Sequence, residues 1–223
     1  MASLEILEDA VNKRVAFISR SRYVLVSIMG LHISRLLRKG YSSICIEDLW
    51  GLKMESMLSS KYLSREDLSR IRIGCGEPDI VYAPWINIAG RKFSRDVKGV
   101  YTDSGKAILF SRGFYVVVIR PMGYSVGNYI IETWDEKIGY IHVGDDGIKE
   151  AWIPSKHVEA YQKIFEAFRI YGSFRFLDAV NMLVRELGID RAEARKILED
   201  LVGMGMIIIT RGMIQPAGGS ENH

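Results

Sequence analysis

The chain has 223 residues, 48% of them hydrophobic and 26% charged, so it can bury a core and does not have the composition of a disordered protein. Its net charge of +3 is too small to indicate a nucleic-acid partner by itself. The longest apolar stretch near the start, residues 23–33, is about half the length of a membrane span, so we expect no membrane segment.

The first segment, residues 1–73, is expected to be helical. One apolar face recurs at three- and four-residue intervals through Leu4, Leu7, Val11 and Val15. A second apolar helix is expected over residues 24–39, where Gly40 follows as a typical C-terminal glycine. Ser64 and Asp67 have the spacing of a capping box, which predicts another helix start. This segment carries a net charge of +4, against −1 for residues 74–155 and 0 for the remainder.

The apolar helix at residues 24–37 also bears on assembly. A helix this hydrophobic lies either in a domain core or in a subunit interface. Because residues 1–73 alone offer only a thin core, burial against a second copy would stabilise them. The sequence therefore predicts a homodimer built on this segment.

The central segment, residues 74–155, is expected to be an antiparallel β meander or small barrel. Short apolar and aromatic runs alternate with turn residues at residues 80–88, 97–101, 107–110, 114–119, 129–134, 138–143 and 148–153. Asp146-Gly147 is the strongest hairpin signal, since tight hairpin turns need residues that accept positive φ. We expect no helix between Lys98 and Ile153.

The third segment, residues 156–216, is expected to form helix, short strand, helix, tight turn, helix and hairpin. The three helices are expected at residues 161–168, 177–187 and 190–202, the short strand at residues 174–176 and the hairpin at residues 206–215. Residues 217–223 are expected to be a flexible tail. The fold class predicted for the whole chain is therefore α+β, with a helical N-terminal region, the central β domain and this C-terminal domain.

The run LEDLVGMGMIIITRGMI, residues 198–214, resembles the third helix and wing of many prokaryotic and archaeal winged-helix regulators. The resemblance covers about residues 156–215, and we state none for residues 1–155. It implies a winged helix-turn-helix module, in which the third helix enters the major groove of DNA. Arg191, Arg195, Lys196 and, at the wing tip, Arg211 are the candidate nucleic-acid contacts. Glu193, Glu199 and Asp200 on the same helix weaken that surface, so docking on a protein partner is an alternative.

A second alternative is a metal-dependent nuclease. Pro78-Asp79 followed by Asp96-Val-Lys98 matches the pattern PD…(D/E)xK, in which two carboxylates hold Mg²⁺ and the lysine positions or activates water. That fold requires a helix after the strand that bears the lysine. Because we expect no helix there, this reading is the less favoured one, and we expect no catalysis and no cofactor.

The remaining polar and aromatic residues predict no further chemistry. The aromatic residues of segment 74–155, with Arg91, Lys92, Arg95 and Lys98, could stack nucleic-acid bases, but sheet core is the favoured interpretation. His32 is expected in a core, and no phosphate loop or dinucleotide fingerprint is present. Two free thiols are expected rather than a disulfide between Cys45 and Cys75, which suits the cytoplasm.

These patterns predict a cytoplasmic winged-helix protein without catalysis, which binds DNA in a regulatory or DNA-processing role. The alternatives are the nuclease and a scaffold subunit whose winged helix docks on protein. The two glutamines and five asparagines are few beside the many charged residues, which is a thermophile tendency.

Overall fold

A computed structural model describes residues 3–52, 61–122 and 127–216 of the chain. The chain divides into two compact units. The α/β unit comprises Met1–Arg120 and Tyr129–Ala151, and the C-terminal unit comprises Pro121–Asn128 and Trp152–His223. Among the described residues, no helix is long and apolar enough to cross a membrane.

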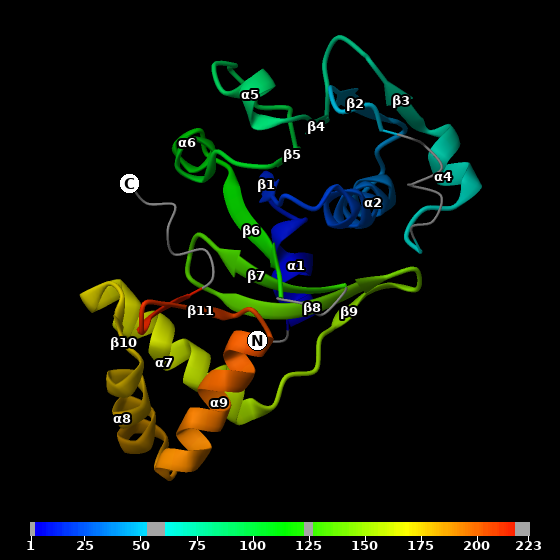
Figure 1. Ribbon diagram of the computed structural model, residues 1–223. Helices are drawn as coiled ribbons and strands as arrows, with labels where there is room; N and C mark the ends of the chain where they lie inside the picture. Colours follow the sequence, from blue (N-terminus) through cyan, green and yellow to red (C-terminus); the bar gives the residue numbers. More distant parts are fainter. Residues whose placement is uncertain (1–2, 53–60, 123–126, 217–223) are drawn as a thin grey trace. The chain divides into compact units, whose positions relative to one another are not determined.

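The α/β unit is built on a nine-stranded sheet in the order β3-β2-β4-β5-β1-β6-β7-β8-β9 (Figure 1). The strands are β1 Val15–Ile18, β2 Ile44–Asp48, β3 Ile71–Ile73, β4 Ile80–Tyr82, β5 Gly99–Thr102, β6 Tyr115–Pro121, β7 Asn128–Thr133, β8 Ile138–Gly144 and β9 Gly147–Glu150. Every recorded pairing from β3 to β6 is parallel, and β8 pairs antiparallel with β9.

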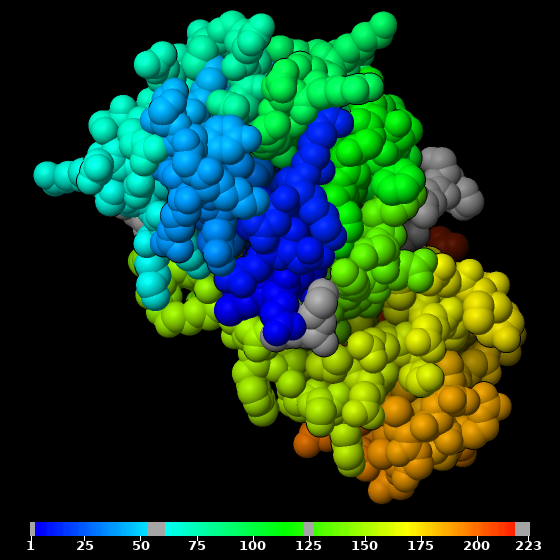
Figure 2. Space-filling view, turned by 180° about the vertical axis from the view of Figure 1, so that it is seen from behind, coloured from blue at the N-terminus to red at the C-terminus, as the bar shows by residue number. Residues whose placement is uncertain are grey.

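Helices cover both faces of this sheet. One face packs against α1 (Ser3–Ala10) and α2 (Arg22–Arg38), and α4 (Arg65–Ser69) lies next to β3. Figure 2 shows α1, in dark blue, beside the lighter blue of α2. The other face is covered by α5 (Trp85–Ile88) and α6 (Lys106–Ser111), with Ile88 and Leu109 in its core. This is a three-layer α/β arrangement around a mainly parallel sheet.

The predicted α+β fold class is therefore wrong. Residues 1–73 are not a helical region, because they contribute β1, β2 and β3 to the same sheet as residues 80–150. All four residues of β1 are buried, as expected for a strand covered on both faces. Such a strand is a short continuous apolar run, which periodicity alone does not distinguish from a helix. Val15, interpreted as the last residue of a helix face, is in fact the first residue of β1.

The central segment also differs from the predicted meander. Strands β6 to β9 follow one another both along the chain and across the sheet, whereas β4 and β5 are neighbours that pair in parallel, which a meander excludes. Residues 80–88 form β4 and then α5 rather than one strand, and residues 107–110 lie within α6. The expectation of no helix between Lys98 and Ile153 is wrong for the same reason. The hairpin at Asp146-Gly147 is confirmed, with Gly144 opposite Gly147.

The helix predicted at residues 24–39 is confirmed as α2, capped by the Ser21 side chain. Its apolar face does not support the predicted homodimer. Val24, Leu25, Ile28, Met29 and Ile33 are fully buried within the core of the α/β unit. The sheet thus supplies the burial that a second copy was expected to supply. The thermophile expectation likewise finds no support in the fold.

Cys45 and Cys75 form a disulfide, so the expectation of two free thiols is wrong. Cys45 lies in β2, and Cys75 follows the neighbouring strand β3. Parallel pairing of these two strands brings residues 30 positions apart to a Cα–Cα distance of 6.0 Å.

The C-terminal unit contains three helices and a small sheet. Its elements are α7 Ser155–Tyr171, β10 Phe174–Arg175, α8 Phe176–Leu187, α9 Arg191–Gly203, β11 Ile207–Thr210 and β12 Met213–Pro216. The strand order is β10-β12-β11, with both pairings antiparallel. The three helices pack against one another, and Tyr161, Leu183 and Leu198 are fully buried. The predicted flexible tail, residues 217–223, lies outside the described residues.

Candidate ligand-binding crevice

Strands β1 and β5 mark a change of direction in the α/β unit. They are parallel neighbours, with Ile18 opposite Thr102 at their carboxyl ends. From β1 the chain enters α2 on one face of the sheet, and from β5 it enters α6 on the other face (Figure 1). Neighbouring parallel strands whose connections leave in opposite directions open a crevice at their carboxyl ends, where ligands of α/β proteins bind.

A hollow of about 420 Å³ lies at this position, and we refer to it as the crevice. It is lined by Arg20, Arg22, Trp50, Asp103 and Ser104. The two arginines follow β1, Trp50 follows β2, and Asp103 and Ser104 follow β5. Three parallel strands thus bring together side chains that are 83 positions apart in the sequence, between Arg20 and Asp103.

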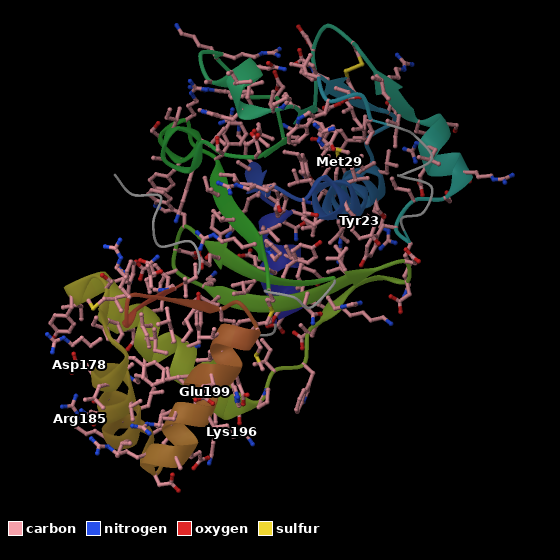
Figure 3. All side chains as sticks on the ribbon, viewed as in Figure 1. Tyr23, Met29, Asp178, Arg185, Lys196 and Glu199 are labelled. Atoms are coloured by element: carbon pink, nitrogen blue, oxygen red, sulfur yellow. A yellow bond between two sulfur atoms is a disulfide. The ribbon has the colours of Figure 1, made fainter. Side chains whose placement is uncertain are left out.

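The arginines lie at the beginning of α2. Ser19 is buried, and its hydroxyl accepts a hydrogen bond from Ser21 N at 3.2 Å. Ser21 caps the helix by accepting from Val24 N, and its hydroxyl lies 3.2 Å from the Tyr129 hydroxyl on β7. The first turn of α2 contains no acidic residue, and Tyr23 marks it in Figure 3. This end of a helix carries partial positive charge and exposed N–H groups, which favour anions.

Trp50 also lines the crevice. The guanidinium of Arg22 lies over its ring, 5.1 Å from the ring centroid. The Tyr82 ring meets Trp50 edge to face at a centroid distance of 4.7 Å. Burial raises the pKa of the Tyr82 hydroxyl to about 12, so this tyrosine is neutral at physiological pH. The Arg22 guanidinium also lines the crevice, next to Arg20.

The turn after β5 completes the crevice. Asp103 Oδ1 accepts hydrogen bonds from Trp85 N at 2.7 Å and from the Thr102 hydroxyl at 3.3 Å. Gly105 follows with φ +95°, and a side chain there would place its Cβ 2.4 Å from the Trp85 ring. The turn therefore needs glycine at position 105 to bring Asp103 and Ser104 to the crevice.

These groups define what the crevice can recognise. Two guanidinium groups and a helix N-terminus attract an anion, and arginine matches the oxygens of a phosphate group with paired N–H donors. Trp50 offers an apolar ring, and Asp103 offers a hydrogen-bond acceptor. The arginines suit the anionic end of an elongated ligand, and Trp50 and Asp103 suit its uncharged remainder.

The residues predicted for a nuclease are arranged differently. Asp79 lies before β4, and its Oδ2 accepts a hydrogen bond from Cys45 N at 2.9 Å. Asp96 Oδ2 accepts from the Ser94 hydroxyl at 3.0 Å, and Lys98 N donates to Asp79 O at 2.7 Å. No group of three or more His, Cys, Asp or Glu side chains that could hold a metal occurs in the part of the chain that the structure describes. Of the aromatic residues considered for base stacking, Tyr82, Tyr101 and Phe114 lie in the core, whereas Phe110, Trp134 and Trp152 are exposed.

The candidate nucleic-acid contacts lie on the C-terminal unit. Arg191, Arg195 and Lys196 are exposed on α9, which also carries Glu199 (Figure 3). Arg191 donates to Asn181 Oδ1 at 2.9 Å, so part of its guanidinium is already engaged. Arg211 is exposed at the turn between β11 and β12, with φ +52°. Their role as contacts stays a prediction.

Sequence reasoning missed all five crevice residues. The available signal was the order of a short apolar run at residues 15–18, the polar residues Ser19 to Ser21, and a long apolar helix. That order is typical of a strand, a ligand-binding turn and a helix in α/β proteins. It was obscured because Val15 was interpreted as part of a helix face and residues 1–73 as a helical region.

Comparison with known proteins finds similarity in structure and none in sequence. No protein-family profile matches the chain, and no curated protein is similar to it in sequence. A KaiC-like protein from the hyperthermophilic archaeon Pyrococcus horikoshii OT3 is similar in structure, with a TM-score of 0.44 and 12% sequence identity. The match covers 62% of this chain and 88% of that protein. At this level of similarity we transfer no function from the neighbour.

The predicted function, a winged-helix protein that binds DNA without catalysis, is corrected by the fold itself. Most of the described chain forms an α/β unit with a nine-stranded sheet, and the crevice belongs to that unit. The nuclease alternative is wrong on other grounds: α6 does follow β5, but Asp79 and Asp96 accept hydrogen bonds from Cys45 N and the Ser94 hydroxyl, and the described residues contain no group of side chains that could hold a metal. The scaffold alternative is replaced together with the predicted fold, because the α/β unit makes up most of the described chain.

Proposed function

We propose that the α/β unit binds a phosphate-bearing small molecule in the crevice. The observation that carries this proposal is the position of Arg20 and Arg22 in a hollow where the connections of β1 and β5 diverge. Both arginines follow β1, next to the N-terminus of α2.

The mode of binding differs from that of a phosphate loop. The turn after β1 reads Ser19-Arg20-Ser21, without the glycines whose backbone amides surround phosphate groups in such loops. Side-chain guanidinium groups are the main donors here, with the hydroxyl of Ser104 as a further donor. Charge-assisted hydrogen bonds of this kind are about twice as strong as neutral ones.

The C-terminal unit has a separate place in the proposal. We keep its resemblance to a winged helix-turn-helix module as a proposal about its fold, supported by the order of three helices, a short strand and a hairpin. Its partners stay predictions from the sequence. A cytoplasmic location also stays a proposal, and the disulfide between Cys45 and Cys75 removes the free-thiol argument for it.

Isothermal titration with inorganic pyrophosphate tests the proposal. We expect binding to the full chain, weakened at least tenfold in Arg22→Gln and further in the double variant with Arg20→Gln, since each loses a charge-assisted contact of roughly 1.5–3 kcal/mol. Arg38→Gln is the matched control, because Arg38 is exposed at the other end of α2 and should leave the affinity unchanged. Absence of pyrophosphate binding, or equal losses in Arg22→Gln and Arg38→Gln, would overturn the proposal.

A further inference from the structure

We propose that the ligand is a nucleotide whose base packs on Trp50 and whose hydroxyl groups donate to Asp103. This inference rests on the proposed function and names the chemical class of the ligand. It follows from the two crevice residues that a bare phosphate group does not need.

Trp50 is held in place before any ligand binds. Its backbone N–H donates to Asp48 Oδ1 at 3.0 Å, and Asp48 Oδ2 accepts from Leu52 N, so the turn after β2 is fixed by one carboxylate. The ring itself is held by the edge-to-face contact with Tyr82. A half-buried indole fixed in this way is a preformed surface for a planar ring.

Arg22 connects the two ends of such a ligand. Its guanidinium lies over the Trp50 ring and also lines the hollow next to Arg20. A planar base can stack on the indole or on the guanidinium, and the phosphate oxygens can accept from the same guanidinium. A ligand that joins an aromatic ring to phosphate over a short distance matches this arrangement.

Asp103 can bind the part of the nucleotide that lies between its base and its phosphate groups. Only its Oδ1 accepts hydrogen bonds from the described residues, and both donors belong to the protein. Oδ2 can accept from a ligand hydroxyl. An unpaired carboxylate would repel a bare phosphate anion, so its presence in the crevice favours a ligand that also carries hydroxyl donors.

Titrations with ADP and pyrophosphate, on the full chain, separate this inference from the proposed function. We expect ADP to bind at least tenfold more tightly than pyrophosphate. Trp50→Leu should lower the ratio of ADP affinity to pyrophosphate affinity roughly tenfold, the loss typical of one base–aromatic stack, because any effect through the Arg22 guanidinium over the ring is common to both probes. Trp50→Phe keeps an aromatic ring and should stay within about threefold of the native affinity. Trp152→Leu is the control, because Trp152 is 87% exposed and lies in the other unit.

Asp103→Asn supplies an independent readout in the ratio of the two affinities. Removing a negative charge favours both anions, but the poorer hydroxyl acceptor weakens ADP alone, so the preference for ADP over pyrophosphate should fall several-fold. Equal affinities for ADP and pyrophosphate, with no effect of Trp50→Leu, would overturn the nucleotide assignment while the phosphate site stands. If neither probe binds, the proposed function fails as well.

Discussion

At the scale of single residues, the crevice depends on backbone positions as much as on the side chains that line it. Gly105 follows Asp103 and Ser104, adopts φ +95°, and lies against the Trp85 ring. Trp85 N in turn donates to Asp103 Oδ1. Substitution at position 105 therefore affects the turn that carries two of the five crevice residues.

Gly105→Ala is expected to destabilise the protein by more than the backbone strain alone. A side chain at positive φ costs about 1–2 kcal/mol, and here the added Cβ would also displace Trp85. Gly40→Ala is the matched control, since Gly40 has φ +97° with nothing within 4 Å. Urea unfolding should show a larger loss for Gly105→Ala than for Gly40→Ala. Equal losses would mean that Trp85 adjusts without cost.

His32 should make stability depend on pH. It is fully buried, its Nδ1 lies 2.8 Å from the Tyr101 hydroxyl, and burial lowers its pKa to about 3. The unfolded histidine, with a pKa of 6.5, binds a proton that the folded one excludes. The contribution of His32 to the free energy of unfolding is therefore constant above pH 6.5. As the pH drops from 6.5 towards 3, this contribution falls by about 1.4 kcal/mol per pH unit.

The His32→Gln variant removes this titration while keeping a hydrogen-bond partner for Tyr101. Between pH 6 and 4.5 its free energy of unfolding should fall less steeply than that of the native protein, by about one proton's worth of slope. Identical slopes for the two proteins would contradict the assignment of a neutral, buried His32.

At the scale of helices and strands, the sequence predicted long helices better than buried strands. The long helix α2 and the capping box at Ser64 and Asp67 are confirmed. Because most of α2 is buried, its length and the glycine that follows it identify it as a helix, rather than a polar face. Strands β1 and β2 were missed because both of their faces are covered and no alternation remains. Helices α5 and α6 are only 4 and 6 residues long, too short for a helical period to emerge.

The disulfide between Cys45 and Cys75 is an element-scale constraint that spacing alone could not reveal. It encloses the chain from β2 to β3, which includes Trp50. Closing a loop of 30 residues stabilises the folded state by about 3–4 kcal/mol in the chain-entropy account. Dithiothreitol should therefore lower the free energy of unfolding by about this amount. The free energy of unfolding of a Cys75→Ser variant should not respond to the reductant. If dithiothreitol leaves the free energy of unfolding of the native protein unchanged, the disulfide contributes little.

At the scale of the whole molecule, the chain combines an α/β unit, which carries the crevice, with a C-terminal unit of three helices and a hairpin. The sequence predicted the order of elements in the second unit because its helices are amphipathic and its turns contain glycine. It failed to predict the α/β unit because parallel pairing joins strands far apart along the chain, such as β1 with β5 and β6. The crevice is a product of that pairing, so the local order of strand, turn and helix at residues 15–38 marks only the part of it that follows β1.

Mapping backbone amide shifts by NMR during titration with pyrophosphate tests the central claim most directly. The account predicts the largest shifts at Ser21, Arg22 and Val24, at Trp50, and at Asp103 and Ser104, three segments that only the crevice brings together. Shifts concentrated at α9 and the β11–β12 turn, or around Pro78 and Asp96, would place the anion elsewhere and contradict the account.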